Sequence, residues 1–322
     1  PFMQDTSLKE LFPEIEPFHS EWLASDGGHT IYVEQSGNPE GRPIIFLHGG
    51  PGGGTGARQR RFFDPAHYRI ILFDQRGCGK SKPLGETTNN TTAHLIADME
   101  AIRNHLNIKE WILFGGSWGS SLALAYGVEY PAVTMGLILR GVFLSRKHEL
   151  EWFLNDVDLF FPELHANLIN HKPYINKSNL VQSYIDLVFA DDREEAKKAA
   201  VMWNTFEGSI LKMLPNVSQG NAGEDVDRDF ELARARVQLH YIKHDCFMDG
   251  AGILQKLAVL KDKPVSIVQG RYDMVCPPKT AYEVARLLPQ SDLIMVPDAG
   301  HSASEAGTLD GLIKATEKFK SL

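Results

Sequence analysis

Three residues that lie far apart in the chain could together perform nucleophilic catalysis. Ser117 lies in the segment GGSWG (115–119), which follows the apolar run WILF and precedes an alanine- and leucine-rich stretch. This is a G-x-S-x-G pattern between a predicted strand and a predicted helix, where a strained turn exposes the serine and the glycines avoid a clash. Because a serine hydroxyl is a weak nucleophile until a base removes its proton, the pattern requires partners elsewhere in the chain.

An acid and a histidine follow in the order expected after such a serine. Asp273 comes just after the apolar run PVSIVQG, and His301 comes just after LIMVPDAG. His301 would take the proton from Ser117 and return it to the leaving group, while Asp273 would orient the imidazole and stabilise its protonated form. We therefore expect these three residues to form a catalytic triad.

A glycine-rich loop, HGGPGGG (48–54), follows the apolar run PIIFLH. It could cradle a phosphate or supply an oxyanion hole, since glycines allow backbone N–H groups to approach a ligand closely. The phosphate interpretation fails because the P-loop pattern is absent there, and the GKS at 79–81 has Asp74 where the first glycine would stand. We expect an oxyanion hole made by the N–H groups of Gly50 and Trp118, each typically lowering the barrier by roughly 3–4 kcal/mol.

The elements that must position these residues alternate between strands and helices. Apolar runs predict strands and 3.6-residue periodicity predicts helices. The expected strands are 31–35, 43–48, 69–74, 111–116, 136–141, 264–270 and 293–300, and the expected helices are 92–106, 120–130, 277–288 and 308–322. This order predicts an α/β-hydrolase fold with a mostly parallel, doubly wound sheet. Residues 142–263 are mostly helical in pattern and predict a cap over the strand ends, with 1–141 and 264–322 forming the core domain.

Composition excludes several classes of function. The chain has 322 residues and a net charge of −8, which argues against nucleic-acid and anionic-membrane partners. No apolar run is long enough for a membrane span, and the N-terminal segment has no secretory signal pattern, so we expect a cytoplasmic protein. The oligomeric state cannot be read from the sequence.

Neither a metal nor a cofactor is expected. The three cysteines are far apart and lack C-x-x-C spacing. His240 and His244 stand four residues apart beside Asp245, which could suggest a metal site, but a third ligand and an HExxH context are missing. A solvated or packed pair is the favoured interpretation.

Five motifs occur together and in order: HGGPGGG, DQRGCGKS, GGSWGS, GRYDMVCPP and PDAGHSASE. With them, the chain from about residue 12 to its end resembles the prolyl aminopeptidases (proline iminopeptidases), α/β-hydrolases that remove an N-terminal proline from short peptides. The resemblance implies the same triad of Ser117, Asp273 and His301. It also implies that the DQRG segment (74–77) supports the loops near the site.

The resemblance extends to the predicted cap, where it implies residues that bind the substrate. Trp203 and Glu207 lie at i and i+4 in a segment similar to the family's WxxWE, whose glutamate binds the substrate amine; Phe206 replaces the second tryptophan. A free ammonium requires such a carboxylate, so the expected partners are short peptides or aminoacyl amides with a free N-terminus. The segment LRGVF (139–143) places Phe143 at the pocket wall.

One departure from the family pattern affects the expected charge of the pocket. Residues 235–242 are similar to the family segment ARIENHYF, which contributes a second amine-binding glutamate. This chain has Gln238 at that position and Ile242 in place of the final aromatic residue. The pocket therefore has one formal negative charge fewer than the family pattern implies.

Three functions are compatible with these observations. The leading one is a serine exopeptidase that releases an N-terminal proline or a similar small residue through an acyl-enzyme. The alternative is a serine esterase or amidase acting on uncharged acyl groups, which Gln238 and Ile242 favour. A binding protein with a vestigial site is disfavoured by the intact set of catalytic residues.

Overall fold

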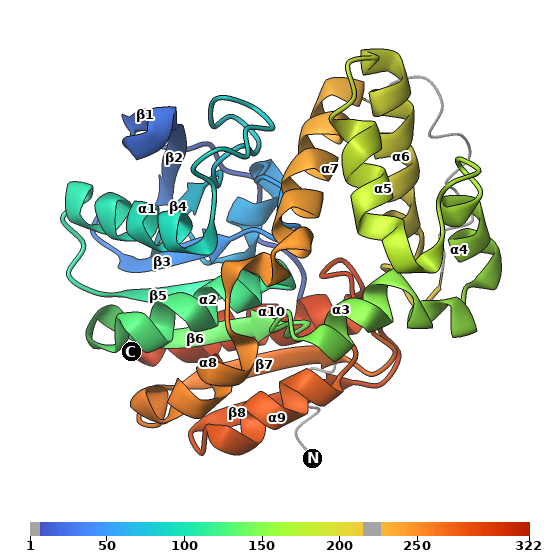
Figure 1. Ribbon diagram of the computed structural model, residues 1–322. Helices are drawn as coiled ribbons and strands as arrows, with labels where there is room; N and C mark the ends of the chain where they lie inside the picture. Colours follow the sequence, from blue (N-terminus) through green and yellow to red (C-terminus); the bar gives the residue numbers. More distant parts are fainter. Residues whose placement is uncertain (1–6, 215–226) are drawn as a thin grey trace.

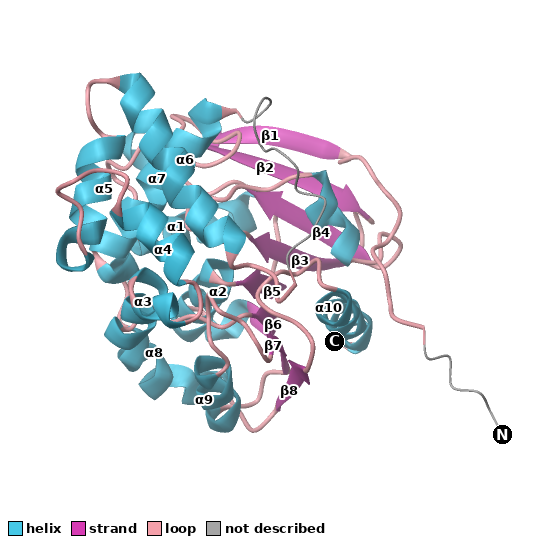
Figure 2. Ribbon diagram, turned by 90° about the vertical axis from the view of Figure 1, so that its right-hand side faces the viewer, coloured by secondary structure: helices cyan, strands magenta, loops and turns pink. Residues whose placement is uncertain are grey.

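One eight-stranded sheet organises the part of the chain that the structure describes (Figures 1 and 2). The computed structural model describes residues 7–214 and 227–322. The strands are β1 (His19–Ala24), β2 (Thr30–Gly37), β3 (Arg42–Leu47), β4 (Tyr68–Phe73), β5 (Trp111–Gly116), β6 (Thr134–Arg140), β7 (Val265–Gly270) and β8 (Ser291–Val296). Their order is β1-β2-β4-β3-β5-β6-β7-β8. The pairings of β2 with β1 and β4 are antiparallel and all others are parallel, which confirms the predicted mostly parallel sheet.

Helices cover both faces of this sheet. They are α1 (Thr92–His105), α2 (Trp118–Glu129), α3 (Lys147–Leu154), α4 (Pro162–Ile169), α5 (Leu180–Val188), α6 (Arg193–Ser209), α7 (Arg228–Lys243), α8 (Gly250–Lys256), α9 (Lys279–Leu287) and α10 (Ala306–Lys318). Figure 2 shows α10 on one side of the sheet and α1, α2, α8 and α9 on the other. None of the helices in these two described stretches combines the length and the apolar character that crossing a bilayer requires.

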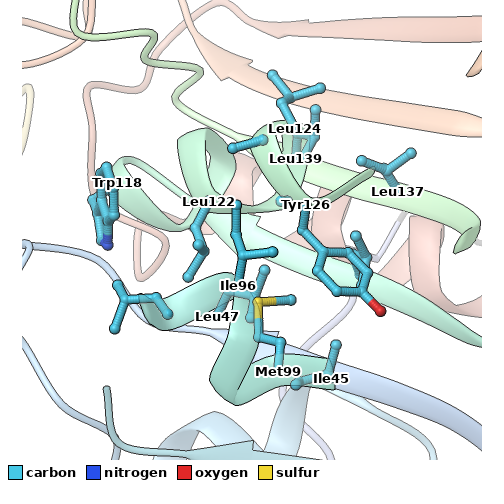
Figure 3. Close-up of a cluster of buried hydrophobic side chains, with 14 of the residues drawn as sticks. Ile45, Leu47, Ile96, Met99, Trp118, Leu122, Leu124, Tyr126, Leu137 and Leu139 are labelled. Atoms are coloured by element: carbon cyan, nitrogen blue, oxygen red, sulfur yellow. The ribbon is translucent and has the colours of Figure 1, made fainter. Parts of the chain in front are cut away.

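The central strands are apolar on both sides because both faces are covered. Successive side chains of a strand point to opposite faces. Accordingly Ile45 and Leu113 belong to the hydrophobic cluster under α1 and α2, whereas their neighbours Ile44 and Ile112 belong to the cluster under α10. Helix α2 is apolar all round, and its residues pack between the sheet and α1 (Figure 3). Its N-terminus is thereby fixed at the carboxyl end of β5.

The chain between β6 and β7 forms helices α3 to α8. Helices α5, α6 and α7 contact one another and stand above the carboxyl ends of the strands in Figure 1. They share a separate hydrophobic cluster with α3 and α4, which includes Trp203 and Phe206. Helix α8 instead contacts α2 of the core layer. The inserted helices thus place one wall of a pocket opposite the strand ends.

Candidate active site

Ser117 occupies a sharp turn between β5 and α2. Its φ of 55° and ψ of −125° are unusual for a residue with a side chain. A Cβ added at Gly115 would come within 2.2 Å of the Gly119 carbonyl oxygen, and one added at Gly119 within 2.1 Å of the Leu47 carbonyl oxygen. The close approach of these backbone segments is therefore the reason that the motif needs glycine on both sides of the serine.

Asp273 and His301 are brought together from the ends of β7 and β8. His301 Nδ1 lies 2.7 Å from Asp273 Oδ2. The other carboxylate oxygen of Asp273 accepts hydrogen bonds from the backbone N–H groups of Val275 at 3.0 Å and Cys276 at 2.8 Å. Both side chains are at most 5% exposed. The aspartate is thus held in place to fix the orientation and tautomer of the imidazole.

The Ser117 hydroxyl faces a sulfur atom in this structure. Its Oγ lies 3.9 Å from Cys276 Sγ, and within the described residues no hydrogen bond joins Ser117 to His301. Burial raises the pKa of the Cys276 thiol well above its ordinary value, and the nearby Asp273 acts in the same direction. Cys276 therefore remains a neutral neighbour of the nucleophile.

Arg140, the last residue of β6, connects the serine turn with the histidine loop. Its carbonyl oxygen accepts a hydrogen bond from the Ser117 backbone N–H at 2.8 Å. Its guanidinium Nη1 donates to the His301 carbonyl oxygen at 2.6 Å. Apart from the position of Arg140 in the LRGVF segment, no sequence pattern indicated this role.

The histidine loop is also attached to the cap. The Leu211 carbonyl oxygen, two residues beyond α6, accepts from the N–H groups of His301 at 2.8 Å and Ser302 at 2.9 Å. The Glu305 carboxylate accepts from the N–H groups of Ser302 and Met213, each at 3.1 Å. The position of His301 therefore depends on the segment that follows α6.

The glycine-rich loop after β3 is held by a buried polar network. His48 Nε2 accepts from the Gln75 backbone N–H at 3.0 Å, and the Gln75 side chain accepts from Trp118 Nε1 at 2.9 Å. The backbone N–H groups of Gly50 and Trp118 donate no hydrogen bond among residues 7–214 and 227–322. Both predicted oxyanion donors are therefore available for a ligand.

Residues of the DQRG segment support the loops around the site. The Asp74 carboxylate accepts from the Thr55 N–H and hydroxyl and from the Lys80 N–H. Arg76 is 1% exposed and forms an ion pair with Asp98, with Nε and Oδ2 2.7 Å apart. These contacts tie the glycine-rich loop to the loop after β4.

A pocket lies between the serine turn and the cap. Its empty volume, which includes space open to solvent, is about 380 Å³. Five residues selected from the sequence line it, namely Gly50, Ser117, Phe143, Glu207 and Gln238; the others are Pro51, Leu150, Phe153, Ile242, Cys246, Val275 and Cys276. The lining is mostly apolar, and Glu207 supplies its carboxylate. This composition suits a small apolar group that carries a positive charge.

Glu207 and Gln238 contact each other inside this pocket. Glu207 is 6% exposed, so it is not a surface carboxylate of α6. Gln238 Nε2 donates to Glu207 Oε2 at 3.0 Å and to the Gly50 carbonyl oxygen at 2.8 Å. Arg234 Nη2 lies 4.0 Å from Glu207 Oε2, a contact that the sequence did not reveal because the two helices that carry these residues meet only in the fold.

Trp203 lies behind the pocket and does not line it. Its Nε1 donates to Gln238 Oε1 at 2.8 Å. Because an indole N–H can only donate, this bond fixes the amide of Gln238 with its NH2 group toward Glu207 and Gly50. Trp203 therefore acts on the pocket through the orientation of Gln238.

The described residues form no cluster of potential metal ligands. Among the described residues, no group of three His, Cys, Asp or Glu side chains could hold a metal ion. His240 Nε2 lies 2.8 Å from the Asn90 carbonyl oxygen, and His244 Nδ1 lies 2.9 Å from the His240 carbonyl oxygen. The His244 ring stacks on Phe247, so both histidines have structural contacts.

Comparison with known proteins connects this geometry to characterised families. Residues 42–308 match the family described as alpha/beta hydrolase fold. The chain is 44% identical over 314 residues to a probable proline iminopeptidase of Leptolyngbya boryana, covering 97% of each protein. It is 40% identical over 314 residues to a proline iminopeptidase of Xanthomonas citri, covering 97% of this chain and 100% of the relative. A crystal structure of the esterase RhEst1 from Rhodococcus sp. ECU1013 has a TM-score of 0.61 at 18% identity, covering 94% of this chain and 98% of the esterase.

Proposed function

The chain belongs to the proline iminopeptidases of the α/β-hydrolase fold, and we propose that it is a serine exopeptidase that releases an N-terminal proline from short peptides. The resemblance predicted from the sequence motifs is thus confirmed at the level of the family. The observation that carries the proposal is the buried carboxylate of Glu207 in the same pocket as Ser117. Its nearest cation, the Arg234 guanidinium, lies 4.0 Å away and does not line the pocket, so the carboxylate can still pair with a positively charged ligand.

Catalysis proceeds through an acyl-enzyme. The Ser117 hydroxyl turns from the Cys276 sulfur toward His301, which accepts its proton as the oxygen attacks the carbonyl carbon of the N-terminal residue. The negative charge that develops on the carbonyl oxygen is stabilised by the N–H groups of Gly50 and Trp118. The C–N bond breaks as His301 protonates the leaving amine, and a water molecule activated by the same imidazole then hydrolyses the ester.

The free N-terminus is recognised at the cap side of the pocket. The protonated amine of a prolyl residue donates to Glu207 and leaves the pyrrolidine ring against Phe143 and the other apolar residues of the pocket. Gln238 presents its NH2 group there, so it cannot accept a second hydrogen bond from the amine. Among the described residues that line the pocket, Glu207 therefore supplies the charge that distinguishes a free from a blocked N-terminus.

The first test removes that charge. Glu207→Gln should raise KM for prolyl-naphthylamide strongly, by about tenfold or more, because a charge-assisted hydrogen bond becomes a neutral one. Turnover of an uncharged p-nitrophenyl ester should change little. Glu194→Gln, on the exposed face of the same helix, is the matched control and should leave both activities unchanged. Equal hydrolysis of N-acetylprolyl and free prolyl anilides by the wild type would contradict the proposal.

A second candidate is a serine esterase or amidase that acts on uncharged acyl groups. The amide of Gln238 favours it, because the hydrogen bond to Glu207 and the nearby Arg234 partly offset the negative charge of Glu207. A panel of p-nitrophenyl esters assayed beside prolyl-naphthylamide separates the two. A preference for the esters by orders of magnitude in kcat/KM would decide for the esterase.

A further inference from the structure

A second cavity is lined by residues next to the catalytic ones. Its volume, part of it open to solvent, is about 730 Å³. The cavity shares no lining residue with the pocket that contains Glu207, but their lining residues are neighbours in the chain: Gly49 and Gly116 line the cavity, and Gly50 and Ser117 line the pocket. Ser302, next to His301, is also part of its wall. We call it the arginine cavity.

The charged side chains that line the arginine cavity are cationic. Arg58 and Arg140 both line it, and no aspartate or glutamate of the described residues does, although the whole chain has a net charge of −8. The Arg140 guanidinium makes a single hydrogen bond within the described residues, to the His301 carbonyl oxygen, and this leaves its remaining N–H groups unused. Burial lowers the pKa of this guanidinium, and the charges of Asp273, Cys276 and Glu305 oppose that change without any of them forming an ion pair with Arg140 among the described residues. The hydroxyls of Ser302 and Ser304 add polar groups to the lining.

The floor of the arginine cavity is aromatic. Phe46, Phe62 and Phe114 line it and pack against one another, with ring centroids 5.4 to 6.3 Å apart. Leu312 of α10 completes this apolar part. A ligand that fits such a space has an apolar group joined to an anion.

We infer that the arginine cavity binds the C-terminal residue of a short peptide substrate, with its carboxylate on Arg58 and Arg140 and its side chain on the phenylalanine floor. The inference rests on the proposed function, because the N-terminal residue must occupy the pocket on the other side of Ser117. If the N-terminal residue of a peptide occupies the pocket and its C-terminal residue occupies the arginine cavity, the first peptide bond lies at Ser117. The enzyme would accordingly favour dipeptides whose second residue is apolar.

The test compares a free with a blocked C-terminus. Wild-type enzyme should cleave prolyl-phenylalanine with a kcat/KM about tenfold above that of prolyl-phenylalaninamide, the effect of one charge-assisted hydrogen bond. Arg58→Gln should reduce this ratio to about threefold or less. Because the ratio is measured within one variant, a general loss of activity does not affect it. Arg286→Gln removes an exposed arginine on α9, away from the cavity, and should keep the wild-type ratio.

Arg140→Lys provides an independent variant. It keeps the charge but loses the planar fork that binds a carboxylate through two hydrogen bonds, so the ratio should fall here as well. An equal kcat/KM for acid and amide in the wild type, or a ratio that neither variant changes, would overturn the inference.

Two further outcomes separate the inference from its premise. Failure to release proline from either peptide and from prolyl-naphthylamide would refute the proposed function itself. N-acetylphenylalanine could inhibit prolyl-naphthylamide hydrolysis in a way that depends on Arg58, while the two peptides are cleaved equally well. The cavity would then bind a free carboxylate that does not belong to the substrate. That result also overturns the inference as stated.

Discussion

Asp273 is the residue of the triad with the most complete set of contacts. One carboxylate oxygen accepts two backbone N–H groups and the other accepts from His301. An asparagine at this position would keep the size of the side chain but would present an NH2 group to one of these donors. The imidazole would then be held in the wrong tautomer for proton transfer.

Asp273→Asn should therefore lower kcat by about ten-thousand-fold with little change in thermal stability. Steady-state kinetics with prolyl-naphthylamide and a thermal melt check both parts. Asp298→Asn is the control, since this exposed acid lies shortly before His301 and outside the pocket. A decrease of less than tenfold for Asp273→Asn would show that another group orients His301.

The sequence was most informative about residues whose function depends on local motifs. The G-x-S-x-G motif predicted Ser117, and the order of the acid and the histidine after it, each just beyond a strand, predicted Asp273 and His301. The bond from Trp203 to Gln238 and the neighbours Cys276 and Arg234 were not predictable. These contacts join segments that are distant in the chain, and only the packing of the cap onto the core determines them.

At the scale of elements, the glycine-rich loop depends on a buried histidine. Burial lowers the pKa of the His48 imidazole from its ordinary value of 6.5; Asp74 opposes this change and Arg234 reinforces it. His48 Nε2 accepts from the Gln75 N–H, so a proton added at this nitrogen would face another donor. The neutral form is therefore the one that holds the loop.

The free energy of unfolding should consequently decrease as the pH falls. The unfolded state binds a proton to His48 more readily than the folded state, so the stabilising contribution is complete above pH 6.5. It is lost as the pH falls below this value, by at most about 1.4 kcal/mol per pH unit for one group. Urea unfolding at about pH 7.5 and about pH 5.5 measures the loss. His48→Gln should lose less free energy of unfolding over this interval, and an equal loss in both proteins would exclude His48 as the cause.

The positions of the buried strands were predicted to within a few residues because a strand that is covered on both faces reads as a continuous apolar run. Strand β1 was missed. It lies at the edge of the sheet and several of its side chains are exposed, so its sequence lacks that signal. Periodicity also placed α1, α2, α9 and α10 close to their observed bounds.

For the whole molecule, the cap and the core approach each other closely where the glycine-rich loop meets α7. Gly52 has a φ of 106°, and an added Cβ would lie 2.7 Å from the Arg234 carbonyl oxygen. Two residues earlier in this loop, the Gly50 carbonyl oxygen accepts from Gln238 on the same helix. The loop that carries a predicted oxyanion donor thus also sets the distance between α7 and the core.

Gly52→Ala should displace α7 from the loop and lower kcat/KM for prolyl-naphthylamide by about tenfold or more, since small displacements of catalytic groups have large effects. Gly208→Ala is the matched control. An added Cβ there meets nothing within 4 Å, and alanine favours the helix, so activity should be unchanged and stability equal or slightly higher. Wild-type kinetics for Gly52→Ala would show that this contact does not control the site.

The sequence predicted that an insertion would cover the strand ends, because the regular alternation of elements is interrupted between residues 142 and 263. It did not predict which inserted helices would pack on the core and which would pack on one another. Helix α8 lies within this interval and packs on α2, while α3 to α7 form their own cluster. Helical patterns indicate which face is apolar but not which partner covers that face.

The histidine loop donates hydrogen bonds to the Leu211 carbonyl oxygen, and its Glu305 carboxylate accepts one from the Met213 N–H; these contacts with the cap limit how this enzyme could be re-engineered. A chimera that receives the cap of a relative would also receive a new anchor for its catalytic base. Exchange of substrate preference between family members would therefore require residues 210–213 and 300–305 to be transplanted as a matched pair.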